Sequence, residues 1–254
     1  MGTAETTSKG EMFMYGMYGY GYGYGFDPTI ILVLIGVALS LWAQGRVNST
    51  FSRYSRVRSM TGMTGAEAAR RLLNAQGIYD VTVQPIAGEL TDHYDPRTKS
   101  VNLSQSVYGA TSVAAIGVAA HECGHAMQDN EGYAPLRFRS ALVPAANFGS
   151  KLSWPLILLG LVFGGLGSPL VEIGILMFSL AVLFQLVTLP VEYNASARAV
   201  RLLDSQGILA GEEVSGTRKV LNAAALTYVA AAATSILQLL RLIILFGGRN
   251  RRDN

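Results

Sequence analysis

The sequence predicts an α-helical integral membrane protein that carries a small α+β domain. Half of its 254 residues are hydrophobic and 15% are charged, a balance that favours membrane-spanning helices over a large soluble fold. Several apolar runs approach the roughly 20 residues that cross a bilayer as a helix. Between the first two runs lies a stretch with mixed helical and strand patterns, and this stretch predicts the α+β domain.

The chain begins with a low-complexity segment, residues 1–27, rich in tyrosine and glycine. Disorder and a position at the membrane interface both stay open for it. Residues 28–45 predict the first transmembrane helix, with a buried helix of a soluble protein as the alternative for so short a run. Arg46 and Arg53 follow it closely, whereas Lys9 is the single basic residue before it. The positive-inside rule therefore predicts that residue 46 onward lies in the cytoplasm.

The predicted cytoplasmic region spans residues 46–151. Within it, residues 65–76 have the pattern of an amphipathic helix. Residues 81–85 and 100–103 predict two short strands, separated by a polar segment with the turn signal Tyr94-Asp95-Pro96. Together the strands predict a short β-hairpin or sheet. Two roles stay open for it: it covers a neighbouring helix, or its edge holds the main chain of a peptide.

The same region contains the motif His121-Glu122-Cys123-Gly124-His125 within an apolar helical pattern. Residues four apart lie on one helix face, so both imidazoles can close on one Zn²⁺. Glu122 points about 100° away and reaches a water on that metal, which makes it the candidate catalytic base. Cys123, the single cysteine, faces away and is interpreted as a small buried side chain. The alternative is a solvated His/Glu pair on an ordinary helix. The chain has only three histidines, and two of them stand at this spacing around a glutamate. The motif therefore predicts a zincin-like peptidase domain with one Zn²⁺ per chain.

A catalytic zinc needs a third protein ligand from elsewhere in the chain. His93 and Glu192 are the leading candidates, and Glu192 is favoured because it starts a helix that can pack against the His121 helix. A membrane-interface glutamate without a metal is the alternative for Glu192. Ser196, one turn further on, is a candidate to hold an imidazole from behind. His93 is also a candidate to orient substrate or to be a hydrogen-bonded loop residue, and Asn102 is a further candidate beside the substrate.

Residues 152–190 predict a transmembrane helical hairpin that leaves the cytoplasm and returns, with a re-entrant first half as the alternative. Pro190 is expected to break or kink its last helix. The positive-inside rule places the C-terminal tail in the cytoplasm, whereas a count of four spans places it outside the cell. The two agree if the last apolar helix lies along or dips into the membrane, with Arg241 snorkelling to its surface. The rest of the chain is expected to divide into a third-ligand helix and a cytoplasmic helix (191–225), an apolar helix in the membrane or at its interface (226–247) and a basic tail (248–254).

Several stretches carry a resemblance to a known family: residues 91–97, Leu103-Ser104, Val107-Tyr108 and residues 118–128. They resemble the bacterial neutral zinc metallopeptidases of the YugP type, over roughly residues 64–240. The plan is more distantly similar to HtpX and the CAAX prenyl endopeptidases, which pair H-E-x-x-H with a later E-x-x-A-D. Glu192 matches the glutamate of that second motif and Ser196 replaces its aspartate. The resemblance implies a gluzincin-like membrane protease with Glu192 as the third zinc ligand.

These features predict a zinc-dependent membrane endopeptidase in which Glu122 takes a proton from a metal-activated water. The expected partners are a peptide or membrane-protein substrate and the lipid bilayer. Nucleic acid is not expected, because the net charge is only +3 and no aromatic-basic pattern is present. The expected location is the bacterial plasma membrane, multi-pass, with the active site on the cytoplasmic side. A non-catalytic zinc-bearing scaffold or partner-binding subunit is the alternative, and the sequence makes no prediction of the oligomeric state.

Overall fold

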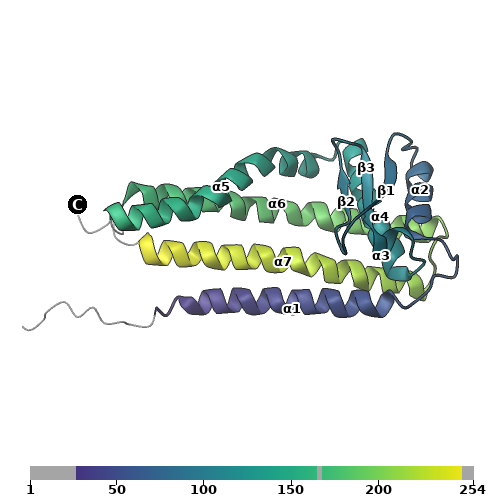
Figure 1. Cartoon of the computed structure of the whole chain (residues 1–254), viewed down its shortest axis with the longest axis horizontal. Coiled ribbons are helices and arrows are strands. Elements are labelled where there is room, and N and C mark those ends of the chain that lie inside the picture. Colours follow the sequence, from purple (N-terminus) through teal and green to yellow (C-terminus); the bar gives the residue numbers. More distant parts are fainter. Residues whose placement is uncertain (1–26, 165–167, 248–254) are drawn as a thin grey trace, which may run out of the picture.

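The structure, a computed structural model, describes residues 27–164 and 168–247. Four long helices lie side by side, and a small α+β domain sits at one end of them (Figure 1). The predicted Tyr/Gly-rich segment, apart from its last residue, and the basic tail lie outside the described residues. The long helices are α1 (Ile30–Tyr54), α5 (Ala134–Gly164), α6 (Pro169–Ser205) and α7 (Glu212–Phe246).

These four helices turn apolar side chains outward. In the described part of the chain they are the helices long and apolar enough to cross a membrane, and only 11–28% of the residues in their apolar windows are buried. Leu41 on α1 is 69% exposed and Phe163 on α5 is 79% exposed. A helix whose outward face is this apolar avoids water only in lipid. The arrangement indicates a membrane protein, and the first predicted span is present as α1, which continues past its apolar run to Tyr54.

The predicted hairpin is present as α5 and α6, which pack against each other. Two boundaries differ from the prediction. α5 begins at Ala134 and runs unbroken to Gly164, whereas the sequence predicts that the hairpin begins at residue 152. α6 continues past Pro190 to Ser205, so the helix does not break there. A proline removes one backbone hydrogen bond, and packing of neighbouring long helices compensates for that loss.

α7 is one helix rather than the two that the sequence predicts at residues 211–225 and 226–247. It runs along α1, and the two approach closely where Gly36 accepts a hydrogen bond from Thr234 Oγ1 at 3.1 Å. At the far end, Arg241 Nη2 lies 2.8 Å from Asp27 Oδ2. The last helix is therefore a fourth member of the bundle, and Arg241 forms an ion pair with Asp27. Both described ends of the chain lie away from the domain (Figure 1).

The small domain contains a three-stranded sheet in the order β1-β3-β2. β3 pairs parallel with β1 and antiparallel with β2. A hairpin made of the two predicted strands is therefore wrong, since those strands are parallel, and the actual hairpin joins β2 to β3. The sequence missed β2 because three residues in a polar segment show no alternation. The elements are α2 (Gly65–Ala75), β1 (Thr82–Ile86), β2 (His93–Asp95), β3 (Ser100–Ser104), α3 (Gln105–Tyr108) and α4 (Val113–Asn130).

α4 lies at the centre of the domain and is buried along most of its length. Ser112 caps its start, because Ser112 Oγ accepts a hydrogen bond from the Ala115 amide at 3.2 Å. α2 packs against one side of α4, and α6 packs against another. At Gly124 an added Cβ would lie 2.6 Å from the Ala195 carbonyl oxygen. Glycine therefore lets α4 and α6 approach closely beside the histidine pair.

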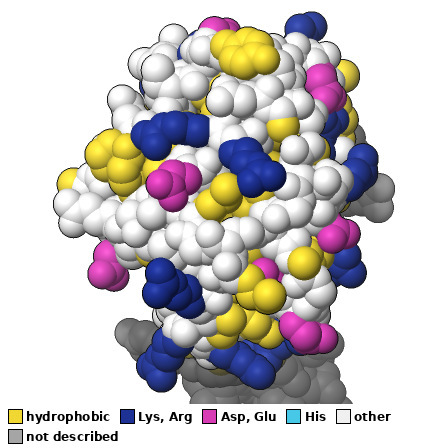
Figure 2. All heavy atoms as spheres, turned by 90° about the vertical axis from the view of Figure 1, so that its right-hand side faces the viewer, with side chains coloured by type: hydrophobic (Ala, Val, Ile, Leu, Met, Phe, Trp, Pro, Cys, Tyr) yellow, Lys and Arg dark blue, Asp and Glu magenta, His cyan; other side chains and the backbone are white. Residues whose placement is uncertain are grey.

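The surface of the small domain carries both positive and negative side chains. Figure 2 shows Lys and Arg side chains interspersed with Asp and Glu, with only scattered apolar groups between them. Such a surface is typical of a face in contact with water. The molecule therefore combines a polar domain with an apolar helical bundle, and the buried α4 lies where the two meet.

Candidate metal centre

His121 and His125 on α4 meet Glu192 on α6. His121 Nε2 lies 3.2 Å from Glu192 Oε2, and His125 Nε2 lies 3.5 Å from the same oxygen. One ligand atom from each of the three residues lies within 4.8 Å of the others. Ligands about 2.0–2.1 Å from a tetrahedral zinc lie about 3.3 Å apart, so both measured distances fit a shared Zn²⁺.

The local helix geometry sets the orientation of the imidazoles. The His121 and His125 rings lie one turn apart on α4, with centroids 4.8 Å apart and planes at 84°. This edge-on arrangement directs both Nε2 atoms toward α6. The close approach at Gly124 brings α6 near enough for a short carboxylate side chain to reach them. Helical spacing and one small residue together assemble the cluster.

The second nitrogen of each imidazole has its own partner. His121 Nδ1 lies 3.0 Å from Ser196 Oγ, and His125 Nδ1 lies 3.0 Å from Gln128 Oε1. The Gln128 amide nitrogen donates to the Val191 carbonyl at 2.9 Å, so its oxygen faces His125. That oxygen only accepts, which puts a proton on His125 Nδ1 and leaves the Nε2 lone pair for a metal. Partners of this kind fix the tautomer and orientation of metal-ligating histidines.

The carboxylate of Glu192 is deeply buried, with its side chain only 3% exposed. Arg139 on α5 brings Nη1 to 3.6 Å from its second oxygen, Oε1. Burial disfavours the charged form of His125, but the carboxylates of Glu192 and Glu122 outweigh burial and raise its pKa above the ordinary value. The buried carboxylates of Glu192 and Glu122 therefore favour a positive charge at the His125 imidazole, as they would favour a bound divalent cation.

Glu122 lines a cavity of about 270 Å³ beside the cluster. His121 and Glu192 form part of its wall, together with Leu90 and Tyr228. The wall combines apolar side chains with polar ones, among them Asp92 and Ser196. A cavity of this kind is typical of a site that binds and positions a ligand. Glu122 itself is buried, with 8% of its surface exposed.

Two residues that the sequence analysis singled out lie in the sheet instead. His93 is exposed on β2, with Nδ1 2.9 Å from the Thr91 carbonyl oxygen. Its Nε2 lies 3.3 Å from the Asn102 amide nitrogen on β3. Asn102 also accepts from Gln84 Nε2 at 2.7 Å. Of the two candidates for the third ligand, the structure therefore places Glu192, and not His93, beside the histidine pair.

Comparison with known proteins assigns the family. Residues 29–247 match the family described as "Putative neutral zinc metallopeptidase". The chain belongs to this family. The match to this metallopeptidase family runs from the start of α1 to the end of α7, so it includes the four long helices as well as the small domain.

One curated relative is similar over nearly its whole length. "Putative membrane protease YugP" of Bacillus subtilis (strain 168) is 49% identical over 224 residues, which cover 88% of this chain and 98% of the relative. The predicted resemblance to the YugP-type zinc metallopeptidases is confirmed. No solved structure matches the chain.

The sequence analysis missed three residues that lie around Glu192 and the histidines. Gln128 follows His125 by three residues, so helix spacing alone could have indicated it. Arg139 and Tyr228 come from α5 and α7, and Tyr228 lines the same cavity as Glu192. Only the packing of separate helices brings these two side chains to the site. Ser196 lies where the sequence analysis placed it, behind His121.

Proposed function

We propose that the protein is a zinc-dependent membrane endopeptidase, with one Zn²⁺ held by His121, His125 and Glu192. The observation that carries the proposal is the convergence of both Nε2 atoms on one Glu192 oxygen at zinc-like spacing. Three protein ligands leave a fourth position open, which is typical of catalytic rather than structural zinc sites. The family description, which names a zinc metallopeptidase, supports the same reading.

The reaction we propose is hydrolysis of a peptide bond in the cavity beside the cluster. When bound, zinc supplies Lewis acidity and lowers the pKa of water toward 7. The Glu122 carboxylate takes a proton from the attacking water and returns it to the leaving amine nitrogen. Ser196 and Gln128 keep the imidazoles oriented throughout. Arg139 balances the charge of the buried Glu192 carboxylate.

The substrate backbone lies, in this proposal, along the outer edge of β2. Leu90 and Asp92 line the cavity and directly precede that strand. Within the described residues β2 is an edge strand, since only β3 pairs with it. An extended peptide added to such an edge gains main-chain hydrogen bonds regardless of its side chains. The cavity also contacts α1 and α7, which suits a peptide or membrane-protein segment close to the bilayer surface.

We also propose that the domain end faces the cytoplasm of a bacterial cell, with the helices in the plasma membrane. Support comes from the basic residues that follow the apolar part of α1: Arg46, Arg53, Arg56 and Arg58. Cytoplasmic segments next to membrane helices carry an excess of such residues.

The test uses the purified full chain with casein as substrate. Glu122→Gln should retain zinc and lose about 10²–10⁴-fold in cleavage rate, because it removes the general base without removing a ligand. Glu192→Ala should lose zinc, measured by metal analysis. Glu131→Gln is the matched control, since Glu131 is an exposed acid paired with Arg198 on the surface. A Glu122→Gln protein that cleaves at the wild-type rate contradicts the mechanism, and a wild-type protein that holds zinc without cleaving favours the scaffold function.

A further inference from the structure

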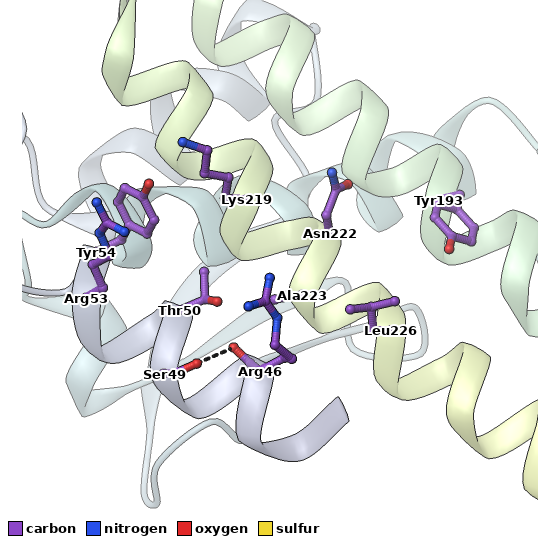
Figure 3. Close-up of a pocket in the computed structure, with 10 residues that line it drawn as sticks. All are labelled: Arg46, Ser49, Thr50, Arg53, Tyr54, Tyr193, Lys219, Asn222, Ala223 and Leu226. Atoms are coloured by element: carbon purple, nitrogen blue, oxygen red, sulfur yellow. Dashed lines mark hydrogen bonds between the residues drawn. The ribbon is translucent and has the colours of Figure 1, made fainter. Parts of the chain in front are cut away.

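A second cavity lies between α1 and α7, with Tyr193 of α6 also in its lining, on the other side of α7 from the metal centre. Its volume is about 670 Å³, and it shares no lining residue with the cavity beside Glu122. Figure 3 shows side chains from α1 and α7 directed into it. We propose that this cavity binds the phosphate group of an anionic membrane lipid.

Three basic side chains line this cavity: Arg46 and Arg53 on α1, and Lys219 on α7. No carboxylate belongs to the lining, and in the described part of the chain none of the three has a carboxylate within 4.0 Å. Like charges gathered without a counter-charge repel one another. The cluster is therefore complementary to an anion that the protein itself does not supply.

Neutral hydrogen-bonding groups surround the three cations. Thr50, Tyr54 and Asn222 contribute two hydroxyls and an amide to the lining. Figure 3 shows the Arg46 guanidinium extending from α1 toward α7. A guanidinium can grip two phosphate oxygens at once, while hydroxyl and amide groups donate to the others. A phosphate thus finds both charge and directed donors in one place.

The position of the cavity favours a lipid over a soluble phosphate. Arg46 lies one helical turn beyond Trp42, an exposed aromatic residue at the end of the apolar part of α1. Tryptophan at such a position marks the level of the lipid headgroups. Leu226 adds an apolar patch to the lining on the side of the helical bundle. Basic pockets between membrane helices at this level are suited to anionic headgroups with their acyl chains beside apolar helix surface.

Occupation would link α1 to α7 at the level of the domain. α7 forms a shared wall, because Lys219 and Asn222 face this cavity while Leu221 and Tyr228 face the metal centre. A phosphate bound by both α1 and α7 would hold the two helices together here by charge, whereas apolar side chains hold them together further into the bundle. The proposal stands on the cavity alone and does not require the protein to be a peptidase.

The test measures binding of phosphatidylglycerol to the full-length protein in phosphatidylcholine nanodiscs, by native mass spectrometry. Arg46→Gln combined with Lys219→Gln should weaken binding about 30-fold, since each membrane-proximal cation contributes about fivefold. Both side chains are exposed and make no ion pair in the described chain, so unfolding temperature should stay at the wild-type value. Lys219→Arg keeps the charge and should retain binding.

The matched control removes the same amount of positive charge near the end of α1. Arg56→Gln combined with Arg58→Gln changes two exposed arginines that do not line the cavity, so neither contacts a lipid held there, and binding should stay within about threefold of wild type. An equal loss in both double variants overturns the proposal, because it indicates diffuse attraction to an anionic surface. Unchanged binding in the cavity variant also overturns it. Inorganic phosphate that displaces the lipid at equal concentration overturns the assignment to a lipid and indicates a free phosphate ligand.

Discussion

Removing the Ser196 hydroxyl tests whether this centre binds metal as its geometry indicates. Ser196 Oγ lies 3.0 Å from His121 Nδ1, and no ligand atom of the centre belongs to Ser196. Ser196→Ala leaves the helix intact, because alanine is a good helix former. It leaves His121 without a partner that fixes its tautomer. Loss of such a partner costs about 10–100-fold in metal affinity, equivalent to about 1.4–2.8 kcal/mol.

The assay is a competition titration of zinc against a chromophoric chelator, with the purified full chain in detergent. Ser205→Ala is the control: it removes an exposed hydroxyl from the same helix, where Oγ contacts only the Leu202 carbonyl. The control should match wild type, and the two variants should unfold at similar temperatures. Equal zinc affinity for Ser196→Ala and Ser205→Ala would refute the reasoning, because the hydroxyl would then not orient a ligand.

Two further predictions concern the interior of α4. Gln128→Met should weaken zinc binding about 10–100-fold and lower the free energy of unfolding by about 1–3 kcal/mol, because His125 Nδ1 and the Val191 carbonyl lose their buried partner. Chelator competition measures the zinc affinity, and chemical denaturation measures the free energy of unfolding. Wild-type values for both quantities would contradict this prediction. Cys123 is fully buried, and burial raises the pKa of its thiol, so iodoacetamide should modify it about a hundredfold or more slowly than in the unfolded chain. A Cys introduced by Ser205→Cys should react rapidly in the same protein, and fast labelling of native Cys123 would show that the interpretation is wrong.

Features fixed by local patterns could be predicted from the sequence. The apolar runs indicated the helices that the structure contains, because a spanning helix needs only length and composition. The H-E-x-x-H spacing predicts that His121 and His125 lie on one face of a helix, and in the structure both Nε2 atoms lie near the same oxygen of Glu192. The interpretation of Cys123 as a small buried residue is confirmed by its full burial.

Features that depend on contacts between distant segments were predicted less well. The parallel pairing of β1 with β3 and the short strand β2 follow from tertiary packing, which local alternation does not record. α6 also continues through Pro190, where the local sequence predicts a break or kink. The position of Glu192 is the exception among long-range features. It was favoured because it starts a helical segment after an apolar run, and a resemblance to known motifs pointed to the same residue.

The arrangement around Glu192 couples the metal centre to the helical bundle. The histidines come from α4, the carboxylate from α6, Arg139 from α5 and Tyr228 from α7. Burying a lone carboxylate costs several kcal/mol unless cations compensate it. Arg139 at 3.6 Å supplies one cation, and a divalent metal at the Nε2 atoms would supply more. Ions that bind only the folded state stabilise it by mass action. Metal binding and the docking of the domain onto α5, α6 and α7 are therefore expected to be parts of one equilibrium, because the same carboxylate takes part in both.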